Sequence, residues 1–235
     1  MATIHKGKNA LKTKANNYLL ISILLAIAPI VYFVAFIQGF YFKGIFHLFP
    51  VMLFWAAIFF WKKYSVLSAG IKGEERTSSI LRELPKGYEV FSSVQLSTNE
   101  GMAELDHVIV GENGVFVVEV KNHNGTIQGR DEDHSWIQHK VGRKGGEYTK
   151  EMRNPVKQVR RQVHILSSYF KQNGINLWIE GAVYFSNPQA NVNVTSERTN
   201  VFTSSNELQT YLTTHSSKRK INHEVLNKAK ALIKR

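Results

Sequence analysis

Two long runs of apolar residues stand out in the first part of the chain. The first covers residues 18–37 without a charge, and the second covers residues 44–61 with His47 as its only ionisable group. A helix of about 20 apolar residues is long enough to cross the roughly 30 Å hydrocarbon layer of a membrane. Because only six residues separate the runs, we predict two transmembrane helices joined as a hairpin.

Two other interpretations of these runs are open. The first run resembles a secretory signal peptide, since Ala26, Ile27 and Ala28 form a small-residue site after a short apolar stretch. Against this, the apolar run continues to Ile37, and Pro29 would directly follow the cleavage point. Alternatively, both runs form a buried hairpin of a soluble protein, but the remaining sequence offers no apolar surface large enough to cover them.

After residue 63 the pattern changes to the short periodic segments of a mixed α/β domain. In chain order we expect a helix over 74–84, strands over 88–96, 103–110 and 115–122, an edge hairpin within 125–146 that contains Trp136, a helix from Asn154, strands over 177–186 and 200–203, a helix over 206–212 and a helical tail from 218. The helix at Asn154 has the clearest signals, because Asn is a favoured N-cap and Pro155 is favoured at the first helical position.

Positive charge is concentrated around the apolar runs. Residues 1–63 contain seven lysines and no acidic residue, and the whole chain has a formal net charge of +12. Four of these lysines precede the first run and two follow the second, whereas Lys43 alone lies between them. Positively charged flanks stay on the cytoplasmic side of a membrane. We therefore expect a two-span protein in the lipid bilayer, with both termini in the cytoplasm.

Charged residues also interrupt an otherwise apolar pair of strands, the second and third of the α/β domain. With the turn at residues 112–113, Asp106 lies opposite Glu119, and with the turn at 113–114 it faces Lys121. In both registers these three side chains project from one face, because the side chains of a strand alternate. The other face is expected to take Leu105, His107, Val118 and Val120.

Two neighbouring carboxylates repel each other and need positive charge nearby. In one interpretation Lys121 supplies that charge, and the three residues form a structural salt bridge. In the other, Asp106 and Glu119 bind Mg²⁺ or Mn²⁺, which completes its shell with water and phosphate oxygens. Lys121 then stabilises the charge that develops on a phosphate during hydrolysis. The chain contains no cysteine, which excludes disulfides, thiolate metal sites and a cysteine nucleophile.

Residues around this triad resemble a known family. The positions concerned are Gly73 and Glu74 at the start of a helix that ends at Leu84 and Pro85, then Leu105–His107, Gly114–Asn122, Gly125, Ile127, Gly129, Trp136, Asn154, Pro155 and Gln158. They resemble the nuclease-related domain (NERD) family, part of the PD-(D/E)xK nuclease superfamily, over about residues 70–212. One position departs from the superfamily pattern, since Leu105 replaces the proline before the aspartate.

The resemblance implies a restriction-endonuclease-like fold, a mixed sheet flanked by helices. It also implies Mg²⁺-dependent hydrolysis of phosphodiester bonds in nucleic acid. As the partner we expect DNA rather than RNA. Carried over by position, Asp106 and Glu119 are the metal ligands and Lys121 is the catalytic lysine. Glu74 matches the acidic residue of the first helix, and Gln158 matches the polar residue of the later helix.

With this resemblance the chain divides into five segments. They are a basic cytoplasmic N-terminus (1–17), two transmembrane helices (18–37 and 44–61), a nuclease-related domain (70–212) and a basic C-terminal tail (213–235).

Two further features bear on function. Lys157, Arg160 and Arg161 lie on one face of the helix that begins at Asn154 and are candidates for binding a phosphate backbone, although a solvated outer face has the same composition. The histidines of the domain follow no zinc-ligand spacing. A rival function is also open, namely a non-catalytic module that binds nucleic acid or protein at the membrane, because a domain can keep an acidic pocket without turnover.

Overall fold

The computed structural model describes residues 1–40, 44–142, 144–215 and 222–234. Lys43, in the turn between the apolar runs, and residues 216–221 of the basic tail lie outside the described residues. The chain forms two compact units. One is Asn9–Ile71, and the other combines Met1–Lys8 with Lys72–Arg235.

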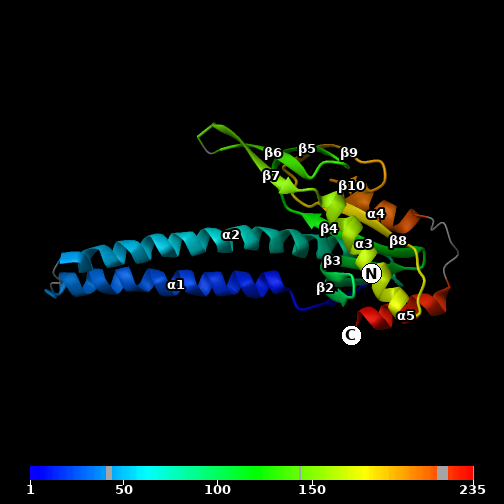
Figure 1. The fold of residues 1–235 in the computed structure, drawn as a ribbon, viewed down its shortest axis with the longest axis horizontal. Helices are drawn as coiled ribbons and strands as arrows, with labels where there is room; N and C mark the ends of the chain where they lie inside the picture. Colours follow the sequence, from blue (N-terminus) through cyan, green and yellow to red (C-terminus); the bar gives the residue numbers. More distant parts are fainter. Residues whose placement is uncertain (41–43, 143, 216–221, 235) are drawn as a thin grey trace. The chain divides into compact units, whose positions relative to one another are not determined.

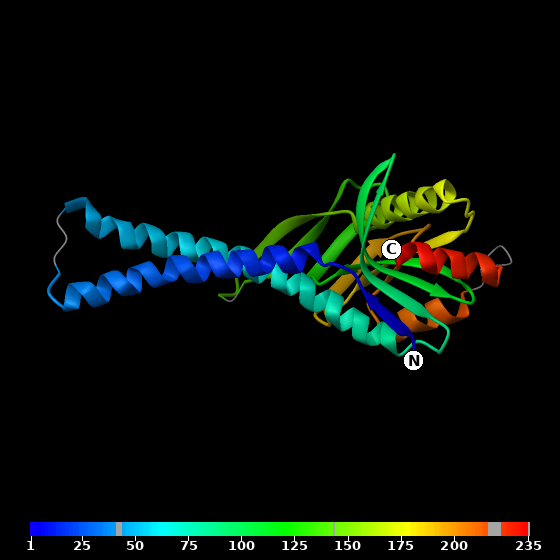
Figure 2. The same cartoon turned by 90° about the horizontal axis from the view of Figure 1, so that it is seen from below.

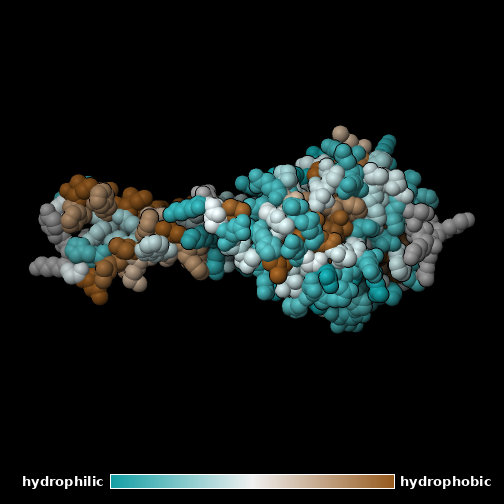
Figure 3. Space-filling model, turned by 90° about the horizontal axis from the view of Figure 1, so that it is seen from above, coloured by the Kyte–Doolittle hydropathy of each residue, from teal (hydrophilic) through white to brown (hydrophobic). Residues whose placement is uncertain are grey.

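The first unit contains one long helix and most of a second, whose last residues, 72–82, belong to the other unit. α1 spans Ala10–Ile37, and α2 spans Leu48–Arg82 after a short 3₁₀ helix, η1, at Gly44–His47. Both are long and apolar enough to cross a membrane, and only 6% of the apolar window in each is buried. Figure 3 shows their hydrophobic side chains, in brown, exposed along the helices. This exposure argues against the alternative of a buried hairpin in a soluble core.

The main sheet of the second unit has six strands in the order β1-β2-β3-β4-β8-β10. Their bounds are Thr3–Lys6 (β1), Glu89–Thr98 (β2), Gly101–Gly111 (β3), Gly114–Lys121 (β4), Ile179–Phe185 (β8) and Asn200–Phe202 (β10). The ladders β2–β3 and β3–β4 are antiparallel, whereas β1, β8 and β10 run parallel to the strands they pair with. The sheet is therefore mixed, as the sequence predicts.

Helices cover both faces of this sheet (Figure 2). α3 (Pro155–Gln172) and α5 (His223–Ile233) contribute to the core on one face, and α4 (Ser205–Thr214) together with the end of α2 contributes to the core on the other. The N-cap prediction for α3 is confirmed, because the Asn154 side chain accepts hydrogen bonds from the backbone N–H groups of Val156 and Lys157. The helix predicted over 74–84 is the end of the much longer α2.

A second sheet of four strands has the order β7-β6-β5-β9. Its strands are Gly125–Arg130 (β5), Ser135–Val141 (β6), Glu147–Arg153 (β7) and Ala190–Thr195 (β9). Trp136 is fully buried between the sheets and stacks on Phe185, with ring centroids 6.4 Å apart. Gly129 permits this packing, because a Cβ there would collide with the Trp136 ring. The hairpin of β6 and β7 extends away from the other strands as an arm (Figure 1).

The sheet differs from the sequence prediction in two ways. It contains a strand that was not predicted, because Thr3–Lys6 within the basic segment 1–17 forms the edge strand β1, with Ile4 packed against the core. Leu105 was expected on the same face as His107, but it packs into the core on the α3 side. The physical cause is Ser93, which lies opposite Asp106 and has a φ of 55°. This backbone conformation interrupts the alternation, so that side chains on either side of it point to different faces of the sheet than simple alternation predicts.

Candidate active site

The β3–β4 hairpin brings the two predicted metal ligands together. Gly111 pairs with Gly114 and His107 with Val118, so the turn is at residues 112–113. This is the register that places Asp106 opposite Glu119 rather than Lys121.

Asp106 lies where the ladder between β3 and β4 ends. The last residue pair of the ladder is His107 with Val118. Beyond it the Asp106 Oδ2 atom accepts a hydrogen bond of 2.7 Å from the backbone N–H of Val120. A side chain therefore replaces the backbone partner that Val120 has lost, which fixes the Asp106 carboxyl at the point where the strands separate.

Lys121 is held by two acceptors from different elements. Its Nζ atom donates to Glu119 Oε1 at 2.6 Å and to Gln158 Oε1 of α3 at 2.9 Å. The other carboxylate oxygen of Glu119, Oε2, accepts a 2.6 Å hydrogen bond from Gln162 Nε2. Glu119 is only 2% exposed. The ion pair predicted by the structural interpretation is therefore present, and α3 fixes both of its members.

Negative charge accumulates around Asp106. Burial raises the pKa of the Asp106 carboxyl well above its usual value, and the charges of Glu119 and Glu74 raise it further. The Val120 N–H group and Lys121 oppose this shift without cancelling it. Glu74, on α2, is therefore close enough to act electrostatically on the Asp106 carboxyl.

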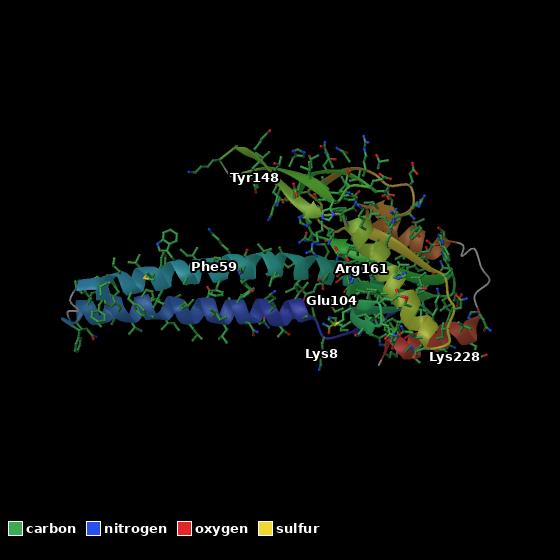
Figure 4. The ribbon with its side chains drawn as sticks, in the orientation of Figure 1. Lys8, Phe59, Glu104, Tyr148, Arg161 and Lys228 are labelled. Carbon is green, nitrogen blue, oxygen red and sulfur yellow. The ribbon has the colours of Figure 1, made fainter. Side chains whose placement is uncertain are left out.

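A cleft of about 620 Å³ adjoins these residues. It is lined by Met102, Ala103, Glu104, His134, Arg153, Asn154, Lys157, Gln158, Arg161 and Gln162. Gln158 and Gln162 belong to both the cleft and the hydrogen-bond network of Lys121 and Glu119. Figure 4 labels two residues of its walls, Arg161 on α3 and Glu104 on β3. The cleft is thus partly basic, and through these two glutamines it borders the hydrogen-bond network of Glu119 and Lys121.

The three basic residues predicted to bind nucleic acid have different surroundings. Arg160 forms an ion pair of 2.6 Å with Asp131 and also donates to Thr199, so its charge is already compensated. The Lys157 Nζ atom donates to the backbone carbonyl of Glu132 at 2.6 Å. Lys157 and Arg161 line the cleft, whereas Arg160 does not.

The residues present fit a hard divalent cation with few protein ligands. In the described part of the chain, no three His, Cys, Asp or Glu side chains are grouped so as to hold a metal ion by themselves. Mg²⁺ needs only one or two carboxylates, because it keeps several waters and binds substrate phosphates. Burial is the main cause of the raised pKa of Asp106, and the charges of Glu119 and Glu74 add to it. A bound cation would offset the part that these two charges contribute.

Gln162 is a site residue that sequence reasoning missed. It follows Gln158 by four residues and so lies on the same face of α3. This spacing could have identified Gln162 from the sequence. Glutamine carries no charge, however, and the charged residues of α3 lie on a neighbouring face of the helix. The histidines considered for zinc are dispersed. His107, for example, is fully buried and bonded to Ser92, on the sheet face away from α3.

Comparison with known proteins identifies a family model over this part of the chain. The model described as nuclease-related domain matches residues 69–186, half of the chain, and this range includes every candidate site residue named above. An uncharacterized protein of Bacillus anthracis, pXO1-01, is 38% identical over 79 residues, which are 33% of this chain and 37% of that protein. The chain thus matches little more than a third of that relative's length. No solved structure matches the chain.

Proposed function

The chain belongs to the nuclease-related domain family, and from this premise we propose that it hydrolyses phosphodiester bonds in nucleic acid, DNA in preference to RNA, with Mg²⁺ or Mn²⁺. The observation that carries the proposal is the fixed position of the Lys121 ammonium. Glu119 and Gln158 hold it beside Asp106, and Gln158 also lines a cleft of about 620 Å³.

Asp106 and Glu119 are the proposed ligands of the cation, and Glu74 adds negative charge near it. When bound, the cation supplies Lewis acidity and an activated water molecule. Lys121 stabilises negative charge on the phosphate, and its two acceptors orient it in advance. Gln162 fixes the Glu119 carboxylate, and Gln158 limits rotation of the lysine side chain.

We further propose that α1 and α2 anchor the domain in a membrane. The support is the length and apolar surface of both helices, together with the lysines that flank them on the side of the termini. In this arrangement the nuclease-related domain, residues 70–212, and the basic tail, residues 213–235, face the cytoplasm.

One observation favours a second candidate, a non-catalytic module that binds nucleic acid or protein at the membrane. Both oxygens of Glu119 accept hydrogen bonds from protein donors, so the ion pair with Lys121 is satisfied without a cation. A domain of this kind keeps the fold and the basic cleft but does not turn over substrate.

The test uses the full-length protein in detergent micelles, incubated with plasmid DNA and with RNA of similar length. The proposal predicts cleavage that requires Mg²⁺ or Mn²⁺, stops in chelator and is faster on DNA. Binding of either nucleic acid without cleavage, across a range of both metals, would favour the non-catalytic module instead.

A further inference from the structure

The arm formed by β6 and β7 carries a set of charges that the active-site network does not use. Gln138 pairs with Lys150, and Lys140 pairs with Tyr148. Alternate residues of a strand share a face, so these four side chains lie on the same face of the arm. Nearer the core, this face carries the buried Trp136 and Met152, which are paired with each other. The face is thus continuous with the side of the sheet that covers the domain core.

His123 connects this face to the active-site lysine. It lies between β4 and β5 and is partly buried, and the Gln138 side chain donates a 2.6 Å hydrogen bond to the backbone carbonyl of the next residue, Asn124. Burial lowers the pKa of His123, and the charges of Lys121, Lys140 and Lys150 lower it further. One imidazole therefore lies within electrostatic reach of three lysines that come from three strands.

The face of the arm that carries Lys140 and Lys150 has no acidic side chain among the described residues. Among the described residues, neither Lys140 nor Lys150 forms an ion pair with an acid. The acids of the arm, Glu147 and Glu151, pair with Val141 and Ile137 on the opposite face. Burial lowers the pKa of Lys140, and the neighbouring Lys150 lowers it further. Positive charges gathered in this way are stabilised when a polyanion binds across them.

An aromatic side chain lies among these lysines. Tyr148 is 52% exposed and is the cross-strand partner of Lys140, one alternate position before Lys150. Figure 4 shows it on the arm. Basic grooves that include an exposed aromatic side chain bind single strands, because phosphates contact the cations and a base stacks on the ring.

We propose that His123, Lys140, Tyr148 and Lys150, here called the arm strip, bind the single-stranded flank of a nucleic acid on one side of the cleaved bond. The two arm lysines contact phosphates, and Tyr148 stacks on an unpaired base. The proposal rests on the proposed function only for the location of the cleaved bond beside Lys121. In this proposal the cleft lined by Lys157 and Arg161 takes the remainder of the strand.

The experiment measures binding of the full-length protein, in detergent micelles and chelator, to a labelled single-stranded DNA oligonucleotide and to its duplex. The test variant combines Lys140→Gln with Lys150→Gln. The matched control combines Lys86→Gln with Lys171→Gln, which removes the same charge from two exposed lysines outside the strip. We expect the test variant to bind the single strand at least about tenfold more weakly at 0.1 M salt, with the control unchanged. Its salt slope should fall by about 1.4, since each lost phosphate contact on a single strand removes about 0.7.

Two further variants separate the contacts from a folding defect. Lys140→Arg combined with Lys150→Arg keeps the charge and should restore binding. Tyr148→Phe keeps the stacking ring and should bind like wild type, whereas Tyr148→Ala should weaken binding to the single strand more than to the duplex. An equal effect of Tyr148→Ala on both probes would overturn the assignment of Tyr148 to an unpaired base.

The outcomes also distinguish this proposal from the proposed hydrolysis, because binding in chelator needs no turnover. If the test variant binds like the control, or if the wild type fails to bind the single strand at low salt, the arm strip is not a nucleic-acid site. If the wild type binds through the arm strip but does not cleave nucleic acid with either metal, the proposed hydrolysis is wrong and the proposed binding by the arm strip is supported.

Discussion

At the scale of single residues, the site is defined by the way Asp106 fits between two separating strands. Its carboxyl satisfies one backbone N–H group, and burial, together with the charges of Glu119 and Glu74, raises its pKa. Lys121 donates hydrogen bonds to Glu119 and Gln158, and it forms no direct hydrogen bond with Asp106. The carboxyl pair is therefore not balanced by one shared lysine, which is the arrangement expected of a site that gains from a cation.

This arrangement predicts the behaviour of Asp106→Asn without metal. The neutral amide retains an acceptor for the Val120 N–H group and removes repulsion with Glu119 and Glu74. Its free energy of unfolding in chelator should equal or exceed that of wild type, by up to about 1 kcal/mol.

Thermal melts across a Mn²⁺ titration provide the second half of that test. Metal that binds only the folded protein raises the melting temperature, so the wild type should gain stability and Asp106→Asn should gain less. A mutant that is less stable than wild type in chelator, with neither protein responding to metal, would identify a structural salt bridge instead.

Gln162 provides a second prediction at this scale. It is only 3% exposed and donates to the buried Glu119 carboxylate. Gln162→Ala leaves that oxygen without its donor, which costs about 1–3 kcal/mol of unfolding free energy. Gln172→Ala, at the exposed end of the same helix, is the control and should change stability by less than about 0.5 kcal/mol. Similar denaturation midpoints for both variants would show that Gln162 does not support Glu119.

At the scale of elements, α3 was predictable because several independent signals coincide. The Asn154 cap, the proline after it and the apolar spacing all indicate a helix. Of the apolar stripe, Val156, Val159, Leu166 and Phe170 are buried and Val163 is partly buried. The central strands were predictable because they are rich in valine and isoleucine. The face shared by Glu119 and Lys121 followed from simple alternation.

Other elements were not predictable, for physical reasons. β1 and β9 are short or edge strands, and β7 has mostly exposed polar residues, so none has a distinct apolar period. Leu105 changes face because Ser93, on the neighbouring strand, has a positive φ. The presence of a serine does not predict a positive φ. The proximity of Asp106, Glu119 and Lys121 could thus be predicted from the sequence, but the contact of Gln162 with Glu119 required the packing of α3 on β4.

The terminal elements are joined through Glu89 on β2. Its carboxylate pairs with His5 of β1 at 2.8 Å and with Lys230 and Lys234 at the end of the chain, at 3.3 and 3.0 Å. Burial alone would raise the pKa of Glu89, but the hydrogen bonds from Lys234, His5 and Lys230 outweigh it and lower the pKa. One acid therefore links the first strand to the last helix.

A lowered pKa in the folded state determines the sign of the pH effect. Glu89 stabilises the folded protein at pH values above 4.5, the ordinary pKa of a glutamate. This stabilisation is lost as the pH falls through the lower pKa that Glu89 has in the folded state. Between neutral pH and acid, wild type should therefore lose more unfolding free energy than Glu89→Gln. Urea titrations at several pH values would show the two curves converging below about pH 4.5, and parallel curves would contradict the role of Glu89.

At the scale of the whole molecule, the chain contains two helices that are long and apolar enough to cross a membrane and, after them, a nuclease-related domain. The chain has no cysteine, so single introduced cysteines report topology directly. Gly39→Cys, between the helices, should react with an impermeant thiol reagent added outside intact cells. Glu132→Cys, exposed on the domain, should react only after lysis. Labelling of Glu132→Cys in intact cells would contradict a cytoplasmic domain.

The central claim is that Lys121 acts on the phosphate during metal-dependent hydrolysis. Its most direct test is the DNA cleavage rate of full-length Lys121→Ala in Mg²⁺ or Mn²⁺, measured alongside DNA binding, with Lys171→Ala as the matched control. Loss of a positioned cation from the transition state should slow cleavage by about 10²–10³-fold. Binding should change little, because it depends on many phosphate contacts. Cleavage by Lys121→Ala at the wild-type rate would contradict the account.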